Sequence, residues 1–166
     1  MGAAATASGS GPIEVVVDTN IWLDILVFDD RSSRRLAALM GPCSTVRPLS
    51  SEEMRAELAD VITRPQFRLD GLRQGSLLAR YDDIVSPALV APDCRLACRD
   101  PDDRKFLDLA VARRAAWLLS KDRALLAARK AAWRRFSLRI GGVDDFYDWL
   151  DAGPQRDVPV CGKEHA

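Results

Sequence analysis

Histidine is almost absent from this chain, and no two of its cysteines form a Cys-x-x-Cys pair. The single histidine is His165, near the end of the sequence, and the four cysteines are Cys43, Cys94, Cys98 and Cys161. Zinc sites need clustered thiolates and imidazoles, so a zinc site is not expected. Catalysis by a histidine base is excluded, because the only histidine lies in the tail. Free, reduced thiols are typical of a cytoplasmic protein, which is the location we expect.

Long hydrophobic runs are also lacking. The longest apolar stretches are far shorter than the roughly 20 residues that cross a bilayer, so no membrane span is expected. The first residues, MGAAATASGSG, have neither the basic start nor the apolar stretch of a secretory signal. We expect residues 1–12 to be a disordered lead-in, 13–152 to form a single domain, and 153–166 to be a flexible tail. A chain of 166 residues is long enough to bury a core within one domain.

The chain also lacks an excess of either charge, since 24 basic residues balance 24 acidic ones. The distribution is uneven: from Arg95 to Arg139 there are thirteen Lys and Arg residues but only five Asp. A basic stretch of this kind is a weak indication of a polyanionic partner. Taken alone, it is better explained as an arginine-rich, solvated surface.

Short apolar runs alternate with helical patterns along the chain. Strands are predicted at residues 13–18, 45–49, 116–120 and 137–140. Helices are predicted at residues 21–28, 31–40, 52–62, 72–84, from 100 onward, 122–130 and 143–150. This alternation is typical of an α/β fold with a parallel sheet covered on both faces, whose ligands sit beyond the carboxyl ends of the strands.

Two predicted strands end on or near an acid. The stretch VVVDTNIWLD, residues 15–24, places Asp18 after a run of valines, and LLSKD places Asp122 after the third strand. Asp18 taken alone is also explained as the N-cap of the following helix. Both acids are expected at the same edge of the sheet.

Helical spacing selects a third acid. Asp103 lies three, four and seven residues before the apolar residues Phe106, Leu107 and Ala110, so it shares their face. Asp108 lies on the opposite face and is expected in solvent, and Asp102 lies at the margin. A carboxylate beside a core is costly unless it is paired or binds a cation.

A fourth acid, Glu57, flanks the apolar stripe of the helix at 52–62. It lies three residues after Met54 and four before Val61, whereas Glu52 and Glu53 point away as first-turn acids. Taken alone, Glu57 is better explained as a surface ion pair.

Four acids on separate elements, Asp18, Glu57, Asp103 and Asp122, are thus expected to converge at one edge. Carboxylates gathered without bases repel one another unless a hard divalent cation is present. Oxygen ligands without histidine or paired cysteine suit Mg²⁺ or Mn²⁺, which activate water for phosphodiester hydrolysis.

Four stretches in order, VVVDTNIWLD, SSEEMRAELADVITRPQF, DPDDRKFLDLA and LLSKDRALL, resemble the motifs of PIN-domain proteins. They are most similar to the bacterial group of toxin components of toxin–antitoxin systems. The resemblance implies a three-layer α/β/α sandwich with a central, mostly parallel sheet. It also implies a Mg²⁺- or Mn²⁺-dependent ribonuclease whose catalytic and metal-binding acids are Asp18, Glu57, Asp103 and Asp122.

Further roles follow from the same motifs. Asn20, Ser120 and Asp102 are expected to support the acids. The basic residues beside them, expected to meet RNA phosphates, are Arg104, Lys105, Lys121 and Arg123. This chain departs from the family in having Ser-Lys-Asp where Thr-Gly-Asp is frequent, and Gly142-Val143-Asp144-Asp145-Phe146 where Thr-Pro-acid-Phe is usual. Asp144 and Asp145 are therefore not assigned to the site.

The resemblance also implies partners, namely an antitoxin protein and a second copy of the chain. The closing helix, with Phe146, Trp149 and Leu150 on one side, is a candidate for such an interface. Trp117, within an apolar strand, is expected in the core, and Trp22 is assigned to neither core nor RNA.

Other functions remain to be weighed. A PIN-like module that binds nucleic acid or a partner but cuts weakly differs from the nuclease in whether its acids bind metal. A phosphotransfer receiver needs adjacent acids after the first strand, and a haloacid-dehalogenase phosphatase needs an Asp where Asn20 stands. A dinucleotide-binding fold needs a glycine-rich turn after that strand, which is absent.

Overall fold

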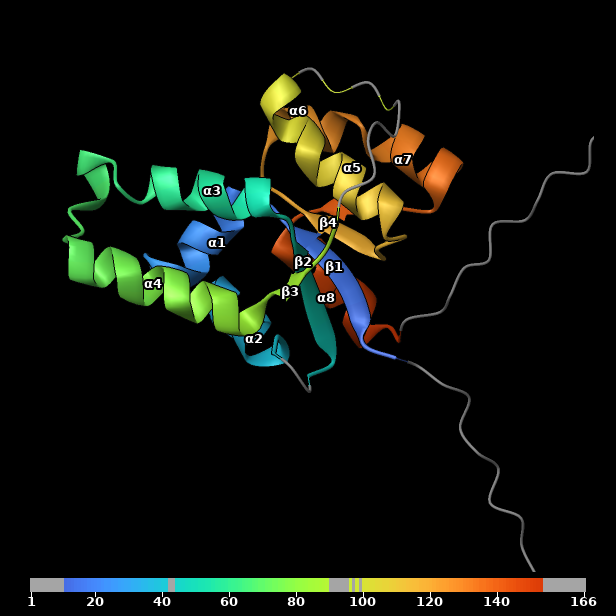
Figure 1. Cartoon of the computed structure of the whole chain (residues 1–166). Helices are drawn as coiled ribbons and strands as arrows, with labels where there is room; N and C mark the ends of the chain where they lie inside the picture. The colour runs from blue at the N-terminus through green and yellow to red at the C-terminus, as the bar shows by residue number, and fades with distance from the viewer. Residues whose placement is uncertain (1–10, 42–43, 90–95, 97, 99, 154–166) are drawn as a thin grey trace, which may run out of the picture.

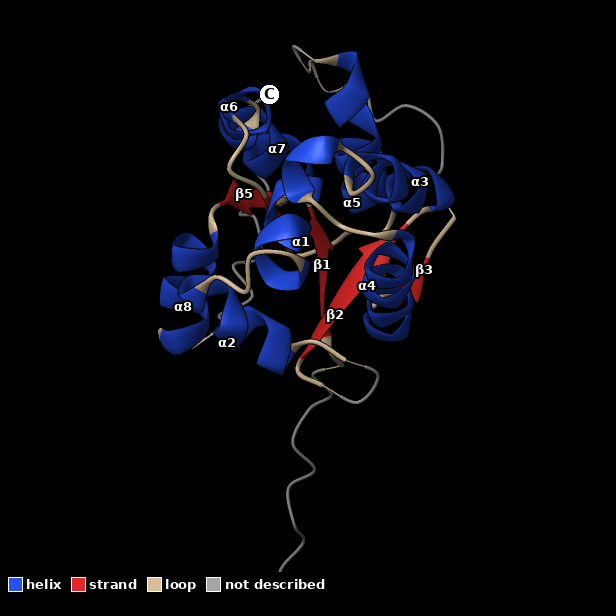
Figure 2. Ribbon diagram, turned by 90° about the vertical axis from the view of Figure 1, so that its left-hand side faces the viewer, coloured by secondary structure: helices blue, strands red, loops and turns tan. Residues whose placement is uncertain are grey.

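The computed structural model describes residues 11–41, 44–89, 96, 98 and 100–153. In these residues the sheet has five strands, all parallel, in the order β3-β2-β1-β4-β5 (Figures 1 and 2). The strands are β1 (Ile13–Val17), β2 (Val46–Ser50), β3 (Ser86–Pro87), β4 (Trp117–Leu119) and β5 (Arg139–Gly141). Residues 1–10 and 154–166, most of the expected lead-in and tail, lie outside the described residues, as do Cys43, Cys94, Cys161 and His165.

Helices cover both faces of the sheet, which confirms the predicted three-layer α/β/α sandwich (Figure 2). Side chains of one core cluster come from α1 (Thr19–Leu26), α2 (Arg31–Leu39), α4 (Gly71–Ile84) and α8 (Val143–Asp151). Those of the second core cluster come from α5 (Arg104–Ala112), α6 (Arg123–Ala127) and α7 (Arg129–Phe136). The remaining helix, α3 (Glu52–Val61), contributes to both clusters, through Leu58 and Met54 respectively.

The valines of β1 explain why this strand reads as a continuous apolar run. Val15 and Val17 belong to the first core cluster, whereas Val16 belongs to the second. Successive side chains of a strand point to opposite faces, so a strand covered on both sides needs apolar residues at every position. All three valines are fully buried.

The strand order creates a switch point beside β1. The chain passes from β1 to β2 and β3 on one side, and later adds β4 and β5 on the other. Neighbouring loops therefore leave the carboxyl ends of β1 and β4 in opposite directions, which opens a crevice there. Asp18 and Ser120 follow these two strands.

Most predicted elements are confirmed to within two residues, but three differ. The two-residue strand β3 was not predicted. The helix predicted at residues 122–130 is the short α6 followed by α7, which continues to Phe136. The segment from Asp100 begins as a 3₁₀ turn at Pro101–Asp103, and α5 starts only at Arg104.

The aromatic side of the closing helix α8 packs against the core, but Trp149 and Leu150 are only partly buried, so the interface suggested from its sequence stays a prediction. Phe146 is fully buried, and the rings of Trp149 and Trp117 lie 5.8 Å apart. Trp117 is in the core, as predicted. Trp22 also belongs to the core, where its ring meets Tyr81 edge to face with 4.7 Å between centroids.

Within the parts of the chain that the structure describes, no helix has the length and apolar character needed to cross a membrane.

Candidate active site

The site is built first on the ends of β1 and β4. Asp18 directly follows β1, is 3% exposed, and donates its N–H to the carbonyl of Leu119 at 2.9 Å. The hydroxyl of Ser120, which is fully buried, donates to Oδ2 of Asp18 at 2.7 Å. The same hydroxyl oxygen accepts the N–H of Asp122 at 2.9 Å. One serine thus connects the two strand-end acids.

Asp122 begins α6. Its Oδ1 accepts the N–H groups of Ala124 at 2.6 Å and Leu125 at 3.4 Å, an N-cap arrangement. Asp18 has the matching role for α1, since its Oδ1 accepts the N–H of Asn20 at 3.5 Å. Cap and site roles are therefore compatible in both acids, and the caps fix where the carboxylates lie.

Asp103 comes from the 3₁₀ turn before α5. Asp100 caps this turn by accepting the N–H of Asp102 at 2.9 Å. Asp103 is half-buried and lines the same cleft as Asp18 and Asp122.

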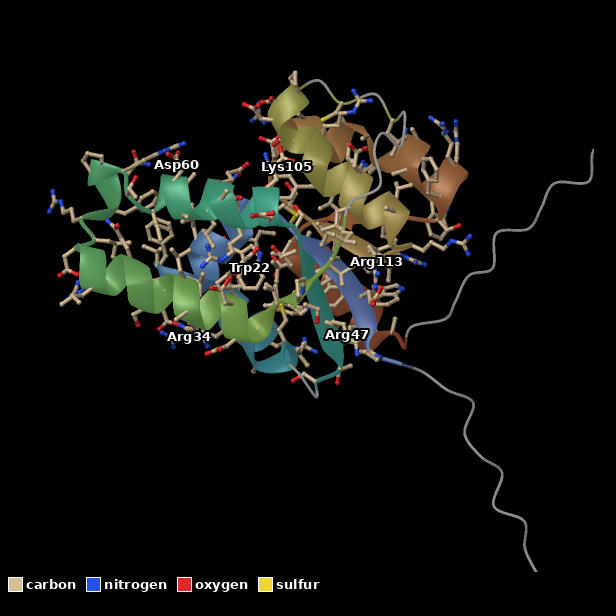
Figure 3. All side chains as sticks on the ribbon, viewed as in Figure 1. Trp22, Arg34, Arg47, Asp60, Lys105 and Arg113 are labelled. Atoms are coloured by element: carbon tan, nitrogen blue, oxygen red, sulfur yellow. The ribbon has the colours of Figure 1, made fainter. Side chains whose placement is uncertain are left out.

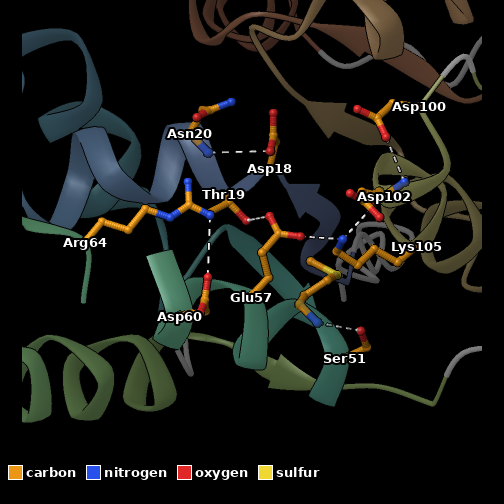
Figure 4. Close-up of polar contacts among 11 residues, drawn as sticks. Asp18, Thr19, Asn20, Ser51, Glu57, Asp60, Arg64, Asp100, Asp102 and Lys105 are labelled. Atoms are coloured by element: carbon orange, nitrogen blue, oxygen red, sulfur yellow. Dashed lines mark hydrogen bonds and ion pairs between the residues drawn. The ribbon is translucent and has the colours of Figure 1, made fainter. Parts of the chain in front are cut away.

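Glu57 projects from α3 toward these acids and is held on both oxygens. The Thr19 hydroxyl donates to Oε1 at 2.6 Å, and the Lys105 ammonium forms an ion pair with Oε2 (Figure 4). Lys105 also donates to the backbone carbonyl of Asp102. Figure 3 shows Lys105 where α5 faces α3, and its side chain is only 8% exposed.

These groups line one open cleft of about 1030 Å³. Seven acids line it: Asp18, Asp24, Glu53, Glu57, Asp102, Asp103 and Asp122. Four basic residues line it: Arg64, Lys105, Lys121 and Arg123. The cleft therefore has an excess of negative charge and favours a cation.

Burial and the mutual repulsion of carboxylates raise the pKa values of two acids in the cleft. Burial raises the pKa of Asp103 to about 6, and the charges of Asp122, Asp18 and Asp100 act in the same direction. Burial also raises the pKa of Asp18 above its usual 3.8, opposed by the Ser120 hydrogen bond and assisted by the charges of Glu57 and Asp122. Raised carboxyl pKa values in a cleft are typical of functional sites.

The donors of the cleft fit a hard divalent cation in their chemistry, since they are carboxylate oxygens without thiolate or imidazole. They are not gathered into a finished cage. Among the described residues, no three acidic, histidine or cysteine side chains are placed so that they could hold one ion. Glu57, engaged by Thr19 and Lys105, would have to exchange a partner to join such a set.

The structure places the remaining predicted residues as follows. Asn20 and Asp102 line the cleft, as do the exposed side chains of Lys121 and Arg123. Arg104 is exposed but does not line the cleft. Lys105, expected to meet RNA, is instead buried against Glu57.

Sequence reasoning missed several residues of the cleft. Thr19 follows Asp18 directly and was not singled out, although a hydroxyl beside a strand-end acid is a usable signal. Glu53, expected to point away, lines the cleft, because the cleft extends along α3 from its first turn to Val61. Phe28 and Phe67 form an apolar end, with ring centroids 5.9 Å apart.

Comparison with known proteins agrees with this geometry. Residues 14–124, from β1 to the start of α6, match the family model described as PIN domain. The match contains all four predicted acids and confirms the resemblance noted in the motifs. No curated protein gives a significant match to the chain.

Proposed function

The chain belongs to the PIN-domain family, a nuclease-type fold, and we propose that it is a divalent-metal-dependent endoribonuclease that hydrolyses RNA phosphodiester bonds. The observation that carries the proposal is the cleft shared by Asp18, Glu57, Asp103 and Asp122, in which the pKa of Asp103 is raised to about 6. A surplus of carboxylates at a switch point is costly to the apo fold and becomes favourable when a cation binds.

In this proposal Asp18, Glu57, Asp103 and Asp122 hold Mg²⁺ or Mn²⁺. A bound ion of this type lowers the pKa of water and neutralises charge that develops on a phosphate. Ser120 keeps Asp18 in position through its 2.7 Å hydrogen bond, and Thr19 does the same for Glu57 at 2.6 Å. Outer partners of this kind orient the oxygens that touch the ion.

The substrate is proposed to meet Lys121 and Arg123 at the mouth of the cleft, with Arg104 outside it. Lys121 and Arg123 lie on either side of Asp122 in sequence and are exposed. Lys121 pairs with Asp24 within the cleft. Phosphate contacts from such residues supply sequence-independent affinity that falls with salt.

The choice of RNA, the toxin role, an antitoxin partner and a homodimer form the finer part of this proposal, and family resemblance supports them. A cytoplasmic location belongs with them. Co-expression with the product of the adjacent reading frame, followed by light scattering of the complex, tests the antitoxin and the dimer together.

The nuclease proposal is tested by incubating a mixed-sequence single-stranded RNA with the protein and Mn²⁺. We expect cleavage that EDTA abolishes and that Asp103→Asn lowers by at least about a hundredfold, as loss of a group acting on developing charge requires. Equal cleavage by the wild type and Asp103→Asn would trace the activity to a contaminant and overturn the proposal.

A second candidate function is a nucleic-acid- or partner-binding module that cuts weakly. The observation in its favour is that no three acids of the described residues form a finished ion site, with Glu57 paired to Lys105. RNA binding that is unchanged by Mn²⁺, together with no cleavage, is the result that would favour this module.

A further inference from the structure

Lys105 is the least exposed lysine or arginine among the described residues, at 9% of its full surface. Burying an ammonium group is costly unless it is paired and hydrogen-bonded. Lys105 has both kinds of partner, since it forms an ion pair with Glu57 and donates to the carbonyl of Asp102. Both partners line the cleft, so the ammonium lies among the acids and not on the outer surface of α5.

Glu57 is correspondingly engaged on both of its oxygens. Lys105 engages its Oε2 and Thr19 its Oε1, and the side chain of Glu57 is 29% exposed (Figure 4). A divalent ion that draws on Glu57 therefore meets a resident positive charge beside the oxygen that it needs. Two cations sharing one carboxylate repel each other across a few ångströms, and partial burial weakens screening.

We propose that Lys105 is a built-in counter-cation of the cleft, which holds Glu57 in the metal-free protein and must release it when a divalent cation binds. Lys105 is in this sense a positioning residue that acts through Glu57. It stabilises the metal-free fold and lowers the affinity for the ion, so that the site is filled only when the divalent cation is abundant. The inference rests on the proposed function to the extent that the cleft takes Mg²⁺ or Mn²⁺.

The cleft offers a matched control for this exchange. Lys121 also lines the cleft and also pairs with an acid, Asp24, but its side chain is 56% exposed and it does not pair with Glu57. Lys105→Met and Lys121→Met each remove one positive charge from the same cleft. Only the first removes the partner of Glu57.

The experiment is Mn²⁺ calorimetry on the wild type, Lys105→Met and Lys121→Met, with thermal unfolding of each protein in EDTA and in Mn²⁺. We expect Lys105→Met to bind Mn²⁺ about tenfold more tightly than the wild type, which corresponds to about 1.4 kcal/mol. The midpoint temperature of its thermal unfolding in EDTA should lie below that of the wild type. The increase in this midpoint on adding Mn²⁺ should exceed the increase seen in the wild type. Lys121→Met should change the affinity by less than about threefold, as expected for a pair whose ammonium group is exposed to solvent.

An equal gain in both variants, or unchanged or weaker binding by Lys105→Met while the wild type binds, would overturn the exchange and leave the nuclease proposal standing. Absence of Mn²⁺ binding in the wild type and in both variants would overturn the proposed metal site itself, and the exchange with it.

A measurement on the wild type keeps the inference testable if Lys105→Met does not fold. The side-chain ammonium signal of Lys105, assigned by comparison with Lys105→Arg in ¹⁵N-lysine-labelled protein, should be visible in EDTA because burial slows its exchange with water. Saturation with Mg²⁺ should release the ammonium group to solvent, so that faster exchange with water broadens its signal as it does for exposed lysines. An ammonium signal that persists unchanged at saturating Mg²⁺ would contradict the release of Glu57.

Discussion

The hydroxyl of Ser120 lies 2.7 Å from Oδ2 of Asp18, across the ends of two neighbouring parallel strands. Both residues are almost completely buried, and the same oxygen accepts the N–H of Asp122. This contact joins the first acid of the cleft to the last, although 102 residues separate Ser120 from Asp18 in sequence. One side chain therefore links the carboxylate of Asp18 to the backbone of Asp122.

Replacing Ser120 by alanine should destabilise the protein by about 1–3 kcal/mol, because it leaves the buried carboxylate of Asp18 and the part-buried N–H of Asp122 without their partner. It should also raise the pKa of Asp18 further, since the lost hydrogen bond acts to lower it. Urea unfolding at neutral pH measures the first effect. Ser33 is the control, because its buried hydroxyl has no hydrogen-bond partner among the described residues. Ser33→Ala should be close to neutral, and equal losses in the two variants would refute the linking role of Ser120.

The raised pKa of Asp103 predicts how stability depends on pH in the absence of metal. Folding raises this pKa from 3.8 to about 6, so the folded protein holds the proton more tightly than the unfolded chain. The contribution of Asp103 to stability is therefore complete below pH 3.8 and is lost as pH rises through about 6. Unfolding free energies in EDTA should fall more steeply over this range for the wild type than for Asp103→Asn, which cannot titrate.

Urea titrations at a series of pH values between 4 and 7 provide the comparison, with pH as the only variable. Asp103→Asn should be the more stable protein at pH 7 in EDTA. A difference in unfolding free energy that stays the same at every pH would contradict a raised pKa for Asp103.

Thr19 should matter for activity more than for folding. Thr19→Val keeps the shape of the side chain but removes the hydroxyl that donates to Glu57 at 2.6 Å. Losing an orienting partner of a ligand group costs about 10- to 100-fold in metal affinity or activity, so we expect a fall of that size in the RNA cleavage rate. Thr63→Val is a suitable control, because its exposed hydroxyl donates only to the Asp60 carbonyl at 2.6 Å. Equal RNA cleavage rates for the two variants would show that the Thr19 hydroxyl does not support activity.

Substitution by alanine should have opposite effects on stability at two glycines, Gly141 and Gly75. A Cβ on Gly141 would lie 2.8 Å from Oδ2 of Asp145 and 3.1 Å from Cζ3 of Trp117, so Gly141→Ala should destabilise by about 1–3 kcal/mol. Gly75 is exposed within α4, and nothing lies within 4 Å of a Cβ placed there. Gly75→Ala should stabilise by about 0.5–1 kcal/mol, because glycine is a poor helix former. Thermal unfolding of the two variants checks both signs, and destabilisation by Gly75→Ala would contradict this packing.

Much of the fold and part of the cleft could be predicted from sequence, because both depend on local periodicity. The valine run of β1 identified a strand covered on both faces, and helical spacing chose Asp103 over Asp108. In the structure Asp103 lines the cleft and Asp108 does not. The meeting of Asp18 with Asp122 at one edge followed from the parallel sheet expected of alternating strands and helices, whereas the order of the strands was not predicted.

The contacts around Glu57 could not be predicted in this way. Thr19 lies 38 residues from Glu57, and Lys105 comes from the opposite side of the cleft, so no spacing within one element relates them. Lys105 was expected to meet RNA because it lies beside the predicted acids in sequence, and the rarity of buried lysine gave no reason to expect otherwise. The strand β3 escaped prediction for another reason, because two residues are too few to show a periodicity.

The central claim is that the acids of the cleft form a divalent-cation site, and Mn²⁺ calorimetry on the wild type and Asp103→Asn tests it most directly. Asp108→Asn is the control, since Asp108 lies on α5 outside the cleft lining. We expect the wild type and Asp108→Asn to bind Mn²⁺ alike at neutral pH, and Asp103→Asn to lose at least about tenfold in affinity, as removal of a ligand oxygen requires. Absence of binding by the wild type at millimolar Mn²⁺, or equal binding by all three proteins, would contradict the account.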